Sequence, residues 1–146
     1  MITLDYELFG AGWANVTIGN GNSQFTLSYS YLHDSLKELA KSAVQIKHSQ
    51  SSTIVFVLEP EECQLILNKL ETNKLRFELR KYPEWSEYNS TRTNFELLMS
   101  GTCTVNNYIN EVRNILIGIL EKMSPSDYKK KWKLSDFPIS EYELLR

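Results

Sequence analysis

Apolar and polar side chains alternate with a period of two over the first part of the chain. Three such runs follow one another, over residues 2–8, 13–18 and 25–31. Because successive side chains of a strand point to opposite faces of a sheet, this pattern predicts three half-buried antiparallel strands. Glycines separate the runs, and Asn20-Gly21 is a strong hairpin signal.

The spacing of apolar residues changes to three and four after Tyr31. It predicts an amphipathic helix whose apolar stripe is Leu32, Leu36, Leu39, Ala40, Ala43 and Val44. Asp34 or Ser35 is expected to cap this helix, with Glu38 answering Ser35 in a capping box.

The middle of the chain is richer in continuous apolar residues. Residues 54–58, IVFVL, are interpreted as a central strand covered on both faces. Further strands are expected around residues 63–67, 75–79 and 95–99, with a loop over 83–93 before the last of them.

A second helix is predicted by an apolar stripe over residues 105–123, with Thr104 as its N-cap. Ser124-Pro125 and Phe137-Pro138 are each expected to open a short helix. The order βββα-ββββ-α predicts an α+β fold: a mainly antiparallel sheet of about six to seven strands with helices packed on one face. No linker or repeat divides residues 1–146, so we expect a single domain.

Composition and charge narrow the range of functions. The net charge is −2, from 16 basic and 18 acidic residues, which gives no general attraction to nucleic acid or anionic lipid. The N-terminal residues lack the features of a secretion signal, and no apolar run has the length of a membrane span. We therefore expect a cytoplasmic protein in which Cys63 and Cys103 are reduced and buried.

The glycine-rich stretch GAGWANVTIGNG, residues 10–21, raises the question of a phosphate-binding loop. A dinucleotide fingerprint requires a further glycine where Asn15 stands, and a helix where a strand is predicted. The Walker sequence Gly-Lys-Ser/Thr is also missing. The glycines are therefore interpreted as turns at the two ends of a short strand, and no cofactor is expected.

Candidates for catalysis and metal binding are few. His33 and His48 have no nucleophile motif near them, and the two cysteines have no CxxC spacing. The acidic run of Glu59, Glu61 and Glu62 is interpreted as a solvated turn. We accordingly expect no catalytic residue and no metal ligand, so that an enzymatic role is disfavoured without being settled.

Two aromatic segments are candidates for recognition. Lysines 129, 130, 131 and 133 surround Trp132, a pattern found in nucleic-acid binding but more typical of a solvated helix end, so binding to nucleic acid is disfavoured. The stretch KYPEWSEYNS interleaves aromatic and acidic side chains in a polar loop. Its candidate partner-binding residues are Tyr82, Glu84, Trp85, Glu87 and Tyr88. The alternative is that these rings cap an open sheet face.

The chain resembles a small bacterial group of α+β proteins that have no assigned activity. The resemblance spans nearly the full length and rests on GAGWANVTI, SYSYLHDSLKELAKSAV, EPEECQLIL and FPISEYELL. More loosely, its size, acidity and layout are similar to those of immunity proteins of toxin–immunity systems. That similarity implies a cytoplasmic inhibitor that binds and blocks a toxin, and it transfers no individual site residue.

These observations together favour a non-catalytic protein-binding domain, with immunity-type inhibition of a bacterial toxin as the most concrete version. The first alternative is a small enzyme or ligand-sensing domain with a pocket between sheet and helices, lined by Tyr6, Trp13, Tyr29 and His33. The second is a structural subunit that forms homo-oligomers through an edge strand.

Overall fold

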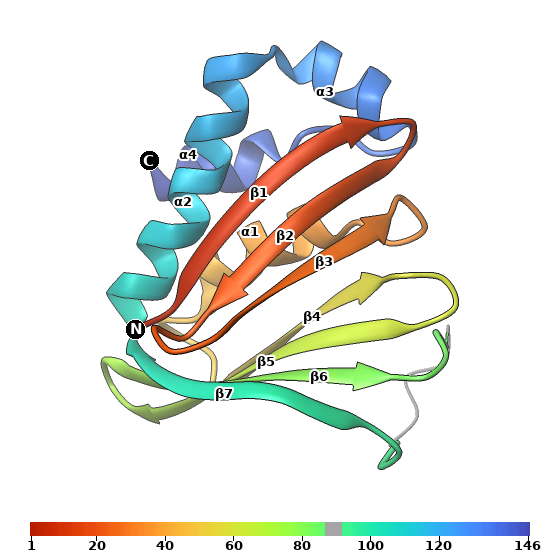
Figure 1. Ribbon diagram of the computed structural model, residues 1–146. Coiled ribbons are helices and arrows are strands. Elements are labelled where there is room, and N and C mark those ends of the chain that lie inside the picture. Colours follow the sequence, from red (N-terminus) through yellow and green to blue (C-terminus); the bar gives the residue numbers. More distant parts are fainter. Residues whose placement is uncertain (87–91) are drawn as a thin grey trace.

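The computed structural model describes residues 1–86 and 92–146 of the chain. In these residues the chain forms seven strands, arranged in two antiparallel sheets, and four helices (Figure 1). The α+β class and the order βββα-ββββ-α are confirmed, whereas the strands divide into sheets of three and four instead of forming one sheet.

The first sheet contains β1 (Thr3–Gly10), β2 (Trp13–Gly19) and β3 (Gln24–Ser30) in that order. The glycine-rich stretch supplies the turns around β2, as predicted. Gly12 has a φ of +80°, and a Cβ there would lie 2.3 Å from the Tyr31 ring, so this turn requires glycine.

The second sheet contains β4 (Ser51–Val57), β5 (Glu62–Glu71), β6 (Lys74–Tyr82) and β7 (Glu96–Thr104) in that order. The interpretation of residues 54–58 as a central strand was wrong, because β4 is an edge strand. Its apolar run is continuous because Ile54 and Phe56 face the core while Val55 is half-buried beside the first helix.

The helices are α1 (Ser35–Gln45), α2 (Val105–Lys122), α3 (Pro125–Trp132) and α4 (Ile139–Leu145). Thr104 caps α2, and Ser124 caps α3 in a capping box with Asp127. Asp34 caps α1, but the capping box predicted for Ser35 and Glu38 was wrong. Both of these side chains instead bond to the backbone of Val55.

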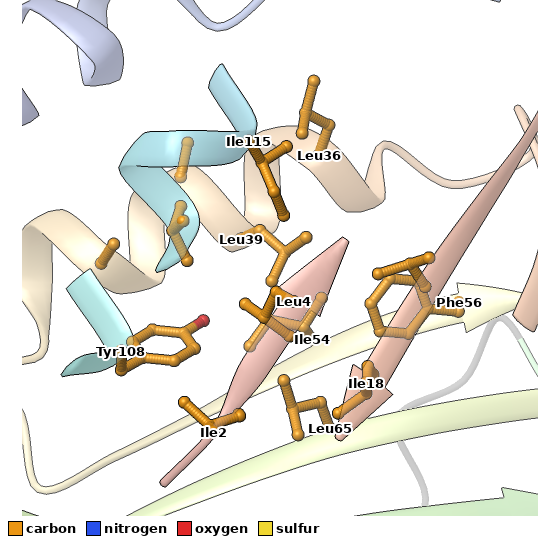
Figure 2. Close-up of a cluster of buried hydrophobic side chains, with 14 of the residues drawn as sticks. Ile2, Leu4, Ile18, Leu36, Leu39, Ile54, Phe56, Leu65, Tyr108 and Ile115 are labelled. Atoms are coloured by element: carbon orange, nitrogen blue, oxygen red, sulfur yellow. The ribbon is translucent and has the colours of Figure 1, made fainter. Parts of the chain in front are cut away.

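The core lies between the helices and the two sheets. In the structure, α1 contacts β4, α2 and α4, while α2 and α3 contact β1 (Figure 1). Figure 2 shows one cluster of this core, to which α1, α2, β1, β2, β4 and β5 contribute side chains. Its labelled residues are Ile2, Leu4, Ile18, Leu36, Leu39, Ile54, Phe56, Leu65, Tyr108 and Ile115.

Helix side chains satisfy the backbone of two edge strands, and we call these contacts the edge caps. The α2 cap uses Asn107, which accepts from Ile2 N–H at 2.8 Å and donates to Ile2 O at 3.2 Å. Glu111 extends it by accepting from the N–H of Leu4 at 2.8 Å. Because an open strand edge is a template for unwanted pairing, these bonds protect β1.

The α1 cap protects β4 in the same way. Glu38 Oε1 accepts from Val55 N–H at 2.5 Å, and the hydroxyl of Ser35 donates to Val55 O at 2.6 Å. Any strand pairing through this part of β4 would have to displace both side chains.

The α2 cap carries a prediction for stability. Asn107→Leu leaves the N–H and C=O of Ile2 without their side-chain partners, so we expect the free energy of unfolding to fall by about 1–3 kcal/mol. Asn106→Leu, at the exposed neighbouring position, is the matched control. Urea denaturation measures both, and equal effects would contradict a role of the cap in stability.

Candidate functional site

Residues 83–95, which we call the recognition segment, leave β6 after Tyr82 and enter β7 at Glu96. Its residues 87–91 lie outside the described residues. The beginning of the segment is tied to the β4–β5 turn, because the N–H of Trp85 donates to the carbonyl oxygen of Pro60 at 2.6 Å. The candidate partner-binding surface is therefore built from two loops at the same end of the second sheet.

A buried carboxylate fixes the recognition segment to β5. Glu62 is only 2% exposed, and its Oε2 accepts from Arg92 Nη2 at 2.5 Å and from Gln64 Nε2 at 2.6 Å. The N–H of Ser86 lies 3.5 Å from its Oε1. A buried charge is tolerated only when it is paired and hydrogen-bonded. The Glu62 carboxylate therefore holds Ser86 and Arg92, at the two described ends of the segment, close to β5.

Arg92 also connects the two ends of the segment. Its Nη1 donates to the carbonyl oxygen of Glu84 at 2.7 Å, and its guanidinium carbon lies 4.2 Å from the centre of the Tyr82 ring. Phe95 packs against the same tyrosine, with ring centres 5.6 Å apart, and lies beneath the guanidinium of Arg80. Aromatic stacking thus adds to the ion pair.

The structure separates the predicted partner-binding residues. Glu84 is exposed and Trp85 is half-buried at the surface, while Tyr82 is 3% exposed and supports the segment from below. Glu87 and Tyr88 lie outside the described residues. Sequence reasoning missed Glu62 and Arg92 as the residues that hold this surface together.

The acidic turn before β5 is only partly solvated. Glu59 is exposed and Glu61 pairs with Lys81 at 3.0 Å, but the interpretation of Glu62 as a solvated acid was wrong. The Glu61 carboxylate, through its hydrogen bond, raises the pKa of Lys81. With Glu84 and Glu96 also exposed, acidic groups outnumber the basic ones around the segment in the described part of the chain.

The four residues proposed for a pocket between sheet and helices do not line one common pocket. Tyr6 and Tyr29 lie on the inner face of the first sheet, with ring centres 6.4 Å apart. By strand alternation Trp13 belongs to the opposite face. His33 stands before α1, where its Nε2 lies 3.0 Å from Glu38 and this hydrogen bond raises its pKa.

A different groove lies between β1 and α2. Its volume is about 420 Å³, its apolar lining includes Leu4, Leu8 and Ile119, and charged residues such as Lys122 and Lys131 also line it. Tyr6 is the one residue of the proposed four that lines it.

The described side chains offer little for nucleophilic or metal chemistry. Burial raises the pKa of Cys63 to about 12 and that of Cys103 to about 11, so both thiols stay protonated at neutral pH. Both are free and buried. Within residues 1–86 and 92–146, no three His, Cys, Asp or Glu side chains gather as a metal site. His48 is exposed in the turn after α1.

Trp132 lies in the core and is 0% exposed. The neighbouring lysines of α3 therefore form an exposed basic tract without an accessible indole ring. In the described part of the chain, none of the helices combines the length and apolar character needed to cross a bilayer.

Comparison with known proteins adds little to this description. No family model matches the chain, and no curated protein matches it. A structure that resembles it is a CdiA-CT/CdiI toxin and immunity complex from Enterobacter cloacae, with 8% identity, a TM-score of 0.47, and coverage of 77% of this chain and 98% of that chain. A likeness of this extent assigns no function to the chain.

Proposed function

We propose that this chain is a non-catalytic protein-binding domain whose binding surface is the recognition segment around Glu84 and Trp85. The observation that carries the proposal is the buried Glu62–Arg92 ion pair, which holds both ends of a surface segment in place. Fixing the described ends of this segment before association reduces the entropy that they lose on binding. Tryptophan is one of the residues enriched at interface hot spots.

The most concrete version of this function is immunity-type inhibition of a toxin in the bacterial cytoplasm. The exposed carboxylates of Glu59, Glu84 and Glu96 favour a partner with a basic surface, because complementary charge accelerates association and selects the partner. Inhibition requires only that the domain cover the partner's active surface, so it needs no chemistry from the inhibitor.

The proposal predicts a loss of binding in the double variant E84A/W85A. The test partner is the product of the gene adjacent to the one encoding this chain, and calorimetry measures its affinity. We expect binding to weaken by at least about thirtyfold, as for a lost hot spot, while the melting temperature is retained. Co-expression should protect growth with the original chain and fail to do so with the double variant.

Two single variants control for surface changes elsewhere. Phe9→Ala removes an exposed aromatic ring from β1, and Glu121→Ala removes an exposed acid from α2. Both should bind as the original chain does. Unfolding of the double variant would show that the indole belongs to the core, and unchanged affinity would show that the interface lies elsewhere. A partner that binds but is harmless would overturn the inhibitor role alone.

A further inference from the structure

Three tyrosines and a tryptophan form a buried polar cluster between the first sheet and α3, which we call the tyrosine cluster. Tyr6 comes from β1, Tyr29 from β3, and Tyr128 and Trp132 from α3. The ring centres of Tyr29 and Trp132 lie 5.5 Å apart, and those of Tyr128 and Trp132 lie 6.5 Å apart. The cluster therefore joins three elements that are distant in sequence.

The polar atoms of this cluster are buried, and none of them has a hydrogen-bond partner of good geometry in the described part of the chain: the three tyrosine hydroxyls and the indole Nε1 of Trp132. The hydroxyl of Tyr6 nevertheless lies close enough to those of Tyr29 and Tyr128 to interact with them. A buried hydroxyl or N–H without a partner costs about 1–3 kcal/mol, so four such groups at one place call for an explanation.

The hydroxyls lie close enough to influence one another. Burial raises the pKa of Tyr6 to about 12, while its contacts with the hydroxyls of Tyr29 and Tyr128 oppose this rise. Burial also raises the pKa of Tyr29 and of Tyr128. All three phenols are therefore neutral at physiological pH, and each can both donate and accept a hydrogen bond.

We propose that the tyrosine cluster is an internal water-binding site. The indole N–H of Trp132 can only donate, so the group it requires is an acceptor. Water is the smallest ligand that both accepts from an indole N–H and donates to phenol oxygens. Buried waters characteristically make about three hydrogen bonds to polar groups that the chain leaves unsatisfied, which is the arrangement these four groups offer.

The site links α3 to the first sheet in addition to a direct backbone bond. The N–H of Gly12 donates to the carbonyl oxygen of Lys131 at 3.0 Å. Water held by Tyr6, Tyr29 and Trp132 supplies a second polar connection, through side chains, between the same helix and sheet.

The direction in which Tyr29→Phe changes stability distinguishes a cluster that holds water from one that does not. In a hydrated site Tyr29→Phe removes a hydroxyl that is bonded to water, and we expect the folded-to-unfolded ratio to fall about fivefold. In a dry site the same change removes an orphaned hydroxyl, and the ratio is unchanged or rises. Tyr108→Phe calibrates the loss of a satisfied buried hydroxyl, because Tyr108 Oη and Ser42 Oγ are 2.6 Å apart.

A second measurement uses the unaltered protein. We expect nuclear Overhauser contacts between the indole proton of Trp132 and water that exchanges with the bulk. We also expect ordered water density at the cluster in a high-resolution crystal structure. A Tyr29→Phe effect of the same sign and size as that of Tyr108→Phe supports the proposal when water is also seen at the indole proton or in the crystal density, because a direct Tyr6–Tyr29 interaction would give the same loss of stability. The proposal is overturned if Tyr29→Phe stabilises the protein. It is also overturned if neither the indole proton nor the crystal density shows water at the cluster.

Discussion

Trp132→Ala is expected to lower the free energy of unfolding by about 3–5 kcal/mol, the cost of removing a large buried aromatic side chain. The indole is 0% exposed and meets the Tyr29 ring edge-on at 5.5 Å. It also stacks against Tyr128 within α3, so its removal leaves a cavity where helix and sheet meet. Guanidinium denaturation followed by circular dichroism measures the loss.

Trp13→Ala is the matched control for this prediction. Trp13 is half-buried on the outer face of β2, where its removal opens the surface and creates no internal cavity. We expect a loss well below that of Trp132→Ala. Similar losses for the two variants would mean that α3 is not docked through its tryptophan.

Arg92→Ala is expected to cost about 3 kcal/mol, because it strands the Glu62 carboxylate in a buried position without its cation. The change also removes the cation above Tyr82 and the bond to Glu84 O. Chemical denaturation measures the cost. Binding of the partner should weaken as well, since the described ends of the recognition segment lose the side chain that connects them.

Two comparisons isolate the buried charge as the cause. Arg76→Ala breaks a pair between the exposed Arg76 and the half-buried Glu78, whose atoms lie 3.6 Å apart. Glu78 keeps its second partner Arg80, so this change should cost less than about 1 kcal/mol. Adding Glu62→Gln to Arg92→Ala should recover part of the lost stability, because a neutral amide is less costly to bury than a carboxylate. An Arg92→Ala effect no larger than that of Arg76→Ala would contradict the argument.

Local patterns predicted most elements of the fold, and they did so for physical reasons. Period-two alternation specified the strands, and the caps at Thr104 and Ser124 specified helix starts, because both effects act over a few residues. The division into two sheets was not predictable in this way. Alternation states which face of a strand is buried and says nothing about which strand lies beside it.

The sequence predicted which residue types form the candidate site but not which contacts hold them in place. Residue type alone makes Glu84 and Trp85 candidates for binding. The pairing of Glu62 with Arg92 spans 30 residues, so no local pattern predicts it. A glutamate in an acidic turn is usually solvated, and only the fold shows that Glu62, two residues after Pro60, is buried. The polar bonds of Ser35 and Glu38 were misassigned for the same reason, since β4 competes for them.

During synthesis of the chain, the edge caps cover β4 and β1 at different times. The α1 cap bridges only 17 to 20 residues, and its helix precedes β4, so that edge can be covered as soon as β4 forms. The α2 cap bridges 105 and 107 residues. During synthesis from the N-terminus, β1 therefore remains open to association with other chains until α2 has emerged, so this edge is exposed to misassembly for longer than the edge of β4.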